Sequence, residues 1–220
     1  MVTGARTLPQ LFETSADRFA GLTMLLEKRD GAYEGVTYAR FRERVHRFAA
    51  GLLSLGLERG DRVALISEGR NDWVMAELGI LYCGAVNVPV SVKIDELDDL
   101  KFRLLHAGCR MAIVSRGQVE KIRAIRNDLP DLTLTVVLDA VEPFGADEMP
   151  AADVLRRGDT FLRDGREAFD ARWRSIAEGD YANICYTSGT TADPKGILLT
   201  HRNYTANVEQ GVAAIRPRPG

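Results

Sequence analysis

The feature that most constrains the fold is an alternation, between residues 41 and 138, of short apolar runs with segments whose apolar residues recur at helical spacing. The run at 63–66 is apolar throughout, which is typical of a strand covered on both faces. We predict further strands at 86–90, 111–115 and 134–138, with helices over 40–53, 71–81, 95–106 and 118–129. Because strands that alternate with helices are joined by right-handed crossovers, the pattern predicts an α/β fold of layered, mostly parallel sheets with helices on both faces.

Composition narrows the class of protein further. Hydrophobic residues make up 45% of the 220 residues and charged residues 27%, the balance of a globular chain rather than a disordered or collagen-like one. The 29 basic and 31 acidic side chains give a net charge of −2, so we expect no nucleic acid partner. The uncharged stretch over 78–92 is too short to cross a bilayer, and no secretory leader is visible at the amino terminus. We therefore expect a cytoplasmic protein without a transmembrane segment, and peripheral membrane contact and oligomeric state are left open.

Several reactive side chains are better explained by packing than by chemistry. Three widely spaced cysteines fit neither a disulfide framework nor a zinc site, so we predict free thiols at Cys83, Cys109 and Cys185. Acidic residues at 95–99 suit the first turn of a helix better than a metal site. We interpret three more candidates as structural: His46 on the arginine-rich face of its helix, His106 at a helix end, and His201 as a local cap, with contact to phosphate as its alternative. The cations Lys121, Arg123 and Arg126 are predicted to form a solvated helix face.

Two other segments lie outside the alternation. Residues 141–150 are predicted to form a surface loop. An amphipathic, charge-rich stretch over 151–177 predicts one or two helices that meet near Gly158 or Gly165, and the helix at 71–81 is predicted to be capped by Asn71 or Asp72.

The segment most suggestive of chemistry lies between two predicted strands, at 181–186 and 197–200. The intervening residues are rich in glycine and hydroxyl groups, and a helix is predicted to follow over 203–215. The spacing from Gly189 to Lys195 is close to that of a Walker A loop, but that loop opens a helix and here a strand follows. Backbone N–H groups, four hydroxyls and one lysine can nevertheless hold phosphate oxygens. The alternative is an ordinary flexible hairpin turn, which would not need a lysine between proline and glycine.

The residues of this loop are recognisable. They read Tyr186-Thr187-Ser188-Gly189-Thr190-Thr191-Ala192-Asp193-Pro194-Lys195-Gly196 and resemble the phosphate-loop signature of the adenylate-forming, or AMP-binding, enzymes. Segments at 36–38, 60–63 and 82–90 resemble amino-terminal landmarks of the same family. Within it, the pair Thr190-Thr191 and the segment 197–203 look most like the long-chain fatty acyl-CoA synthetases. One departure is Ala192, where the family usually has glycine.

The resemblance implies an ATP-dependent ligase that activates a fatty acid to acyl-AMP and then to acyl-CoA, with ATP, Mg²⁺ and coenzyme A. It assigns phosphate binding to Thr187, Ser188, Gly189, Thr190, Thr191, Lys195 and Gly196, a catalytic role to Lys195, and a magnesium contact to Thr187. Two alternatives stay open. One is another adenylate-forming ligase, such as an acyl-AMP ligase or an amino-acid adenylation domain, and the other is a non-catalytic nucleotide-binding module.

The resemblance also implies a domain organisation. Family members are roughly two to three times as long as this chain, so residues 1–220 are expected to be an incomplete amino-terminal AMP-binding domain. Residues 1–180 would form an α/β subdomain, and 181–220 the phosphate-loop hairpin and its following helix. The carboxy-terminal domain would be absent, and the chain alone would be inactive.

Overall fold

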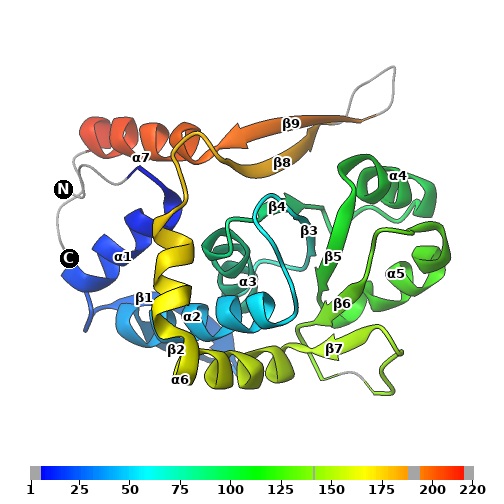
Figure 1. Ribbon diagram of the computed structural model, residues 1–220, viewed down its shortest axis with the longest axis horizontal. Coiled ribbons are helices and arrows are strands. Elements are labelled where there is room, and N and C mark those ends of the chain that lie inside the picture. The colour runs from blue at the N-terminus through cyan, green and yellow to red at the C-terminus, as the bar shows by residue number, and fades with distance from the viewer. Residues whose placement is uncertain (1–5, 141, 188–193, 216–220) are drawn as a thin grey trace.

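A seven-stranded sheet with helices on both faces forms the body of the molecule (Figure 1). The computed structural model describes residues 6–140, 142–187 and 194–215. In chain order, the elements are α1 (Leu8–Arg18), β1 (Thr23–Arg29), β2 (Ala32–Thr37), α2 (Tyr38–Ser54), β3 (Arg62–Ile66), α3 (Asn71–Tyr82), β4 (Val86–Pro89), α4 (Leu97–Ala107), β5 (Cys109–Val114), α5 (Val119–Ile125), β6 (Leu134–Val137), β7 (Glu148–Pro150), α6 (Ala151–Arg174), β8 (Tyr181–Thr187), β9 (Lys195–Thr200) and α7 (His201–Ile215).

The predicted alternation is confirmed. The strand order in the large sheet is β7-β6-β5-β3-β4-β8-β9, and every neighbouring pair is parallel except β8 with β9. A separate antiparallel hairpin is formed by β1 and β2. The observed fold is therefore a mostly parallel α/β fold, as the sequence predicts.

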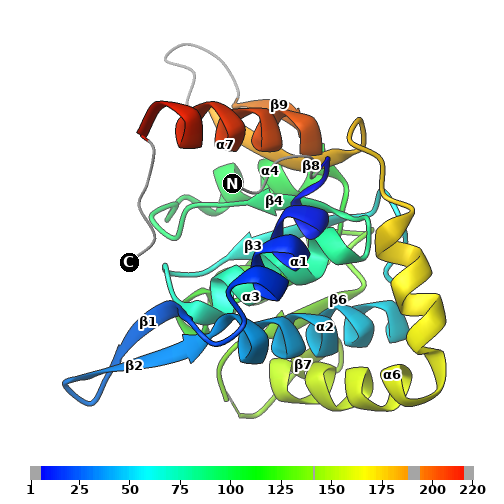
Figure 2. The same ribbon diagram turned by 90° about the vertical axis from the view of Figure 1, so that its left-hand side faces the viewer.

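Each inner strand faces two hydrophobic layers, because successive side chains of a strand point to opposite faces. Val63 and Leu65 of β3 are buried with residues of α1, α2, α3 and α6, whereas Ala64 and Ile66 are buried with residues of α4 and α5. In Figure 1 the first group of helices lies to the left of the central strands and the second to the right, and Figure 2 shows the first group from its outer side. Burial on both faces explains why the segment 63–66 is apolar throughout.

The long helix α6 packs directly against α2, and two glycines make this possible. A Cβ atom on Gly158 would lie 1.7 Å from the carbonyl oxygen of Arg47, and one on Gly51 would lie 2.0 Å from that of Val154. Gly158 is therefore a contact point inside the helix, and of the two predicted junctions, Gly158 or Gly165, the second is confirmed. The break lies at Gly165, whose φ of −121° and ψ of 23° are not helical.

Some sequence predictions differ from the structure. The helix predicted over 118–129 is shorter, because one-turn 3-10 segments flank α5 on both sides. The predicted loop over 141–150 ends in β7, whose Glu148 carboxylate accepts from Nε and Nη2 of Arg123, each at 2.7 Å. The helix α3 is preceded by Arg70 rather than capped by Asn71 or Asp72, and the Asp72 carboxylate instead binds Arg70.

The interpretation of Lys121, Arg123 and Arg126 as a solvated helix face is wrong. The Lys121 ammonium donates to the backbone carbonyls of Val92 at 3.2 Å and Ile94 at 2.9 Å. Arg123 binds Glu148, and Arg126 binds Asp147. These cations connect α5 to neighbouring loops, a role that spacing along one helix does not indicate.

Two structural predictions about reactive groups are confirmed. All three cysteines are free thiols, and Cys83 and Cys109 are buried. Asp98 and Asp99 lie in the first turn of α4, where they bind Lys101 and Arg103. Within the described residues, no helix has both the length and the apolar character needed to cross a membrane.

Candidate phosphate-binding site

The candidate site lies at the open end of the β8–β9 hairpin. These strands pair from Tyr181 with Thr200 to Thr187 with Lys195, so the structure brings the two ends of the predicted loop together. Thr187 and Lys195 are opposite one another and both are exposed. The other predicted phosphate-binding residues, Ser188, Gly189, Thr190 and Thr191, lie outside the described residues. A strand follows the loop, which confirms that this is not a Walker A arrangement.

At position 196, close packing of neighbouring side chains favours glycine, which the sequence alone does not show. In the hairpin it lies opposite Tyr186. A Cβ atom at this position would lie 3.0 Å from Ile184 and 3.4 Å from the ring of Tyr186. Glycine therefore leaves room for the Tyr186 ring to lie across β9, beside Lys195.

The helix α4 contacts the same end of the hairpin. The Tyr186 hydroxyl lies 2.8 Å from Nδ1 of His106 and donates to the carbonyl oxygen of Arg103 at 3.1 Å. Burial raises the pKa of Tyr186. His106 is thus structural, as predicted, but its partner lies 80 residues away in sequence. The role of Tyr186 was not predicted, and the one feature of the sequence that could have indicated it is its position directly before Thr187.

His201 connects the far end of the hairpin to the first helix. The side chain is fully buried, and its Nδ1 accepts a hydrogen bond from the backbone N–H of Leu8 at 3.3 Å. Burial lowers its pKa to about 4, which keeps the ring neutral. His201 is therefore a cap, but of α1 and not of its own helix. The local cap of α7 is Thr200, whose hydroxyl accepts from the backbone N–H of Asn203 at 3.3 Å, while Oδ1 of Asn203 accepts from the backbone N–H of Thr200 at 2.9 Å.

A buried polar cluster, which the sequence did not indicate, lies where β4 and β8 pair. The amides of Asn87 and Asn183 donate to the same carboxylate oxygen of Glu77, at 3.2 and 3.3 Å. Asn183 also donates to the hydroxyl of Tyr204 on α7 at 2.6 Å. Burial raises the pKa of Glu77. The cluster fixes β8 against α3 and α7 rather than facing the loop end of the hairpin.

His46 is a second correction to the sequence analysis. Its predicted structural role agrees with its burial, but its side chain does not lie on a solvated face: it is bonded to Glu13, which also accepts from the hydroxyl of Tyr82. Burial raises the pKa of Glu13, but these two hydrogen bonds and the positive charge of His46 and Arg42 together leave the pKa lowered. The cluster joins α1, α2 and α3 and lies away from the hairpin.

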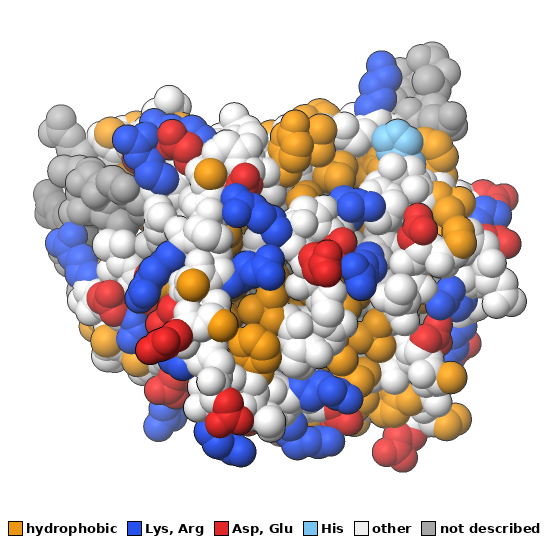
Figure 3. Space-filling view, in the orientation of Figure 1, with side chains coloured by type: hydrophobic (Ala, Val, Ile, Leu, Met, Phe, Trp, Pro, Cys, Tyr) orange, Lys and Arg blue, Asp and Glu red, His pale blue; other side chains and the backbone are white. Residues whose placement is uncertain are grey.

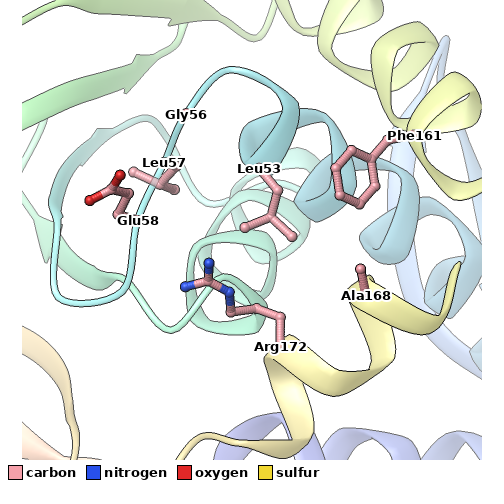
Figure 4. Close-up of a pocket in the computed structure, with 7 residues that line it drawn as sticks. All are labelled: Leu53, Gly56, Leu57, Glu58, Phe161, Ala168 and Arg172. Carbon is pink, nitrogen blue, oxygen red and sulfur yellow. The ribbon is translucent and has the colours of Figure 1, made fainter. Parts of the chain in front are cut away.

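No group of three histidine, cysteine or acidic side chains with metal-binding geometry occurs among residues 6–140, 142–187 and 194–215. A cavity of about 290 Å³ lies between the end of α2 and α6, with Leu53, Phe161 and Arg172 among its lining residues (Figure 4). None of its lining residues belongs to the hairpin. On the face shown in Figure 3, acidic and basic side chains of the described residues are interspersed. Among the predicted phosphate-binding residues, the one cationic side chain is that of Lys195.

Comparisons with known proteins cover nearly the whole chain. Residues 12–218 match the family of AMP-binding enzymes. The long-chain-fatty-acid–CoA ligase ACSBG1 of Bos taurus is 27% identical over 95% of this chain and 28% of its own length. A propanoyl:CoA ligase of Rhodococcus jostii, named for a bicyclic dioxo-substituted acid, is 30% identical over 89% of this chain and 38% of its own length. The chain thus spans well under half of either relative.

Solved structures agree on the fold. A putative long-chain-fatty-acid CoA ligase from Rhodopseudomonas palustris superposes with a TM-score of 0.77 at 19% identity, over 97% of this chain and 49% of that one. An anthranilate CoA ligase bound to anthranoyl-AMP superposes with a TM-score of 0.74 at 22% identity, over 94% of this chain and 37% of that one. The α/β fold is therefore that of the amino-terminal part of adenylate-forming enzymes. With the match over 12–218, the chain belongs to the AMP-binding enzyme family.

Proposed function

We propose that this chain is the phosphate-binding part of a ligase that uses ATP to activate a fatty acid and transfers the acyl group to coenzyme A. The observation that carries the proposal is the pairing of Thr187 with Lys195 at the open end of the hairpin. The pairing places a hydroxyl and an ammonium group at the two ends of a segment of glycine and hydroxyl residues. Family membership supports the same reaction type.

The reaction would take place in two balanced steps. A carboxylate oxygen of the acid attacks the α-phosphorus of ATP, and the bond to pyrophosphate breaks. The thiol of coenzyme A then attacks the acyl carbon, the thiol proton is lost, and AMP leaves. The first step builds negative charge on the departing pyrophosphate, so fixed positive charge and hydrogen-bond donors near the β- and γ-phosphates lower its barrier.

We assign these roles residue by residue. Lys195 neutralises the outer phosphates, and Ser188, Gly189, Thr190, Thr191 and Gly196 supply hydroxyl or backbone donors. Thr187 would hold Mg²⁺, because its neutral oxygen is a ligand type that this hard cation accepts beside phosphate oxygens and water. The ion, when bound with ATP, would reduce the charge of the phosphates. Thr187 supplies one oxygen only, so the carboxylate ligands would come from elsewhere.

The substrate we propose is a long-chain fatty acid, which is the acid in the names of the Bos taurus relative and of several others. The Rhodococcus jostii relative is named for a different acid, so an assay should offer both classes. We place the activity in the cytoplasm, which fits three free cysteines. We also propose the division of the chain into an α/β subdomain over 1–180 and a part over 181–220 that contains the phosphate loop.

The test is the substitution Lys195→Met in a polypeptide that contains this chain and the residues that the relatives have beyond it. We expect ATP–pyrophosphate exchange to fall about 30-fold to 1,000-fold, because a preorganised charge of this kind is worth about 2 to 4 kcal/mol in the transition state. Lys28→Met is the matched control, since Lys28 is an exposed lysine on the separate β1–β2 hairpin. Exchange within a few fold of the unmodified protein would refute the assignment of Lys195.

A further inference from the structure

The strand β8, which leads into the predicted phosphate loop, is hydrogen-bonded to the helix α4 through Tyr186. In β8, Tyr186 directly precedes Thr187, and its hydroxyl contacts two residues of α4. The His106 ring meets the Tyr186 ring edge-on at 5.8 Å, and the Arg103 guanidinium lies 5.4 Å from the centre of that ring. Figure 1 shows α4 beside the loop end of the hairpin.

The direction of the two hydrogen bonds can be assigned from the donors available. A phenol has one hydrogen, and the backbone carbonyl of Arg103 can only accept, so the Tyr186 hydroxyl donates to it. The hydroxyl oxygen must then accept from His106, which requires the proton to be on Nδ1. Tyr186 is therefore held by two bonds of opposite direction, which fixes both the position and the rotation of its hydroxyl.

The α4 partners are themselves fixed. The Arg103 guanidinium makes two hydrogen bonds to the Asp99 carboxylate, at 3.0 and 3.1 Å. The His106 ring stacks on Phe102 with 5.4 Å between ring centres and 18° between planes. Both supporting contacts lie within α4, so the Tyr186 hydroxyl is attached to one rigid element rather than to a loop.

Tyr186 also reaches the other strand of the hairpin. Its ring lies across Gly196, the residue next to Lys195, where an added Cβ atom would come within 3.4 Å of it. The Tyr186 side chain thus contacts both α4 and Gly196, and Tyr186 itself is bonded directly to Thr187 in the chain.

We propose that Tyr186 is a positioning residue for phosphate binding, with His106 and the Arg103 carbonyl as its anchor on α4. It does not touch the nucleotide. It fixes where Thr187 and Lys195 stand relative to the sheet, so that less freedom is lost when phosphate binds. The inference rests on the proposed function of the loop.

The test is a titration of the 220-residue chain with Mg-ATP, followed by NMR through the amide signal of Gly196. We expect His106→Leu, which removes one of the two hydrogen bonds, to weaken binding about fivefold to tenfold, and Tyr186→Phe, which removes both, to weaken it at least as much. His106→Asn should stay within about twofold of the unmodified chain, because the asparagine amide can donate from nearly the position of Nδ1. Tyr181→Phe is the matched control, since Tyr181 is the half-exposed tyrosine at the other end of β8.

The outcomes separate this inference from the proposed function. If Lys195→Met abolishes binding but Tyr186→Phe and His106→Leu bind as tightly as the unmodified chain, the loop binds phosphate and the positioning role is refuted. If His106→Asn is as weak as His106→Leu, the donated hydrogen bond is not the cause and the proposal fails. If the unmodified chain shows no binding, or Lys195→Met does not weaken it, the proposed function and this inference both fall.

Discussion

At the scale of single residues, glycine allows two helices to pack with their backbones in contact. The backbone of α6 touches that of α2 at Gly158, where a methyl group would overlap the carbonyl of Arg47. A flexible side chain could move aside, but a helical carbonyl cannot move without breaking the helix. The requirement for glycine at this position is therefore one of space.

We predict that Gly158→Ala destabilises the chain by about 3 kcal/mol or more, at or beyond the upper end of ordinary overpacking. The matched control is Gly211→Ala in α7, where an added Cβ meets nothing within 4 Å. Alanine there should stabilise the helix by up to about 1 kcal/mol. Urea unfolding monitored by circular dichroism measures both, and equal stabilities for the two variants would contradict the contact.

At the scale of elements, the strands buried on both faces could be predicted and the amino-terminal elements could not. The segment 63–66 is recognisable in the sequence as an unbroken apolar run, because both faces of β3 are covered. By contrast, α1 and the β1–β2 hairpin escaped prediction. The six residues of β2 alternate little in burial, four of them being exposed, and α1 buries only Pro9, Phe12 and Ala16. A local pattern is weak where few residues of an element reach the core.

At the candidate phosphate-binding site, too, local patterns could be predicted and contacts between distant residues could not. Two apolar runs separated by a short loop predict the hairpin, but the strands extend further than the predicted 181–186 and 197–200, so the pairing of Thr187 with Lys195 was not predicted. The contact between Tyr186 and Arg103 joins residues 83 positions apart, and no spacing along the chain reveals it. His201 was identified as a cap from its place at a helix start, but its partner Leu8 is 193 positions away.

The cap of α1 by His201 makes the docking of this helix dependent on pH. The ring must be neutral to accept the N–H of Leu8, and burial lowers its pKa from 6.5 to about 4. Because the unfolded chain binds this proton more readily, the contribution is complete above pH 6.5 and is lost as pH falls from there towards 4. The full loss is about 3 kcal/mol.

The measurement is urea unfolding of the unmodified chain and of His201→Asn at pH 7 and pH 5. The asparagine oxygen can accept from Leu8 but does not titrate. We expect the unmodified chain to lose more stability than the variant between the two pH values. A difference that does not change with pH would show that His201 is not the titrating group.

At the scale of the whole molecule, the large sheet ends in β9, a strand that the described residues cover only in part on each face. Ile197 and Leu198 are consecutive in β9 and are 46% and 49% exposed. Since consecutive strand residues point to opposite faces, neither face of this edge strand is fully covered by the described residues. The opposite edge differs, because β7 is attached to α5 through Arg123 and Glu148.

The last prediction concerns what the 220 residues can do alone, and it is that they bind Mg-ATP weakly without turnover. In-line attack needs the acid, the ribose and the α-phosphate held together, and placing reactants in this way accounts for a large part of such a barrier. The described residues at the open end of the hairpin contribute Thr187 and Lys195, which we assign to the outer phosphates, and the chain spans only 28% to 38% of the two relatives described above. The measurement is fatty-acid-dependent ATP–pyrophosphate exchange by the purified chain, with Lys195→Met as the control for a contaminating enzyme. We expect no exchange above that control. Clear exchange that Lys195→Met abolishes would contradict the prediction, because it would mean that residues 1–220 already hold the α-phosphate and the acid in line.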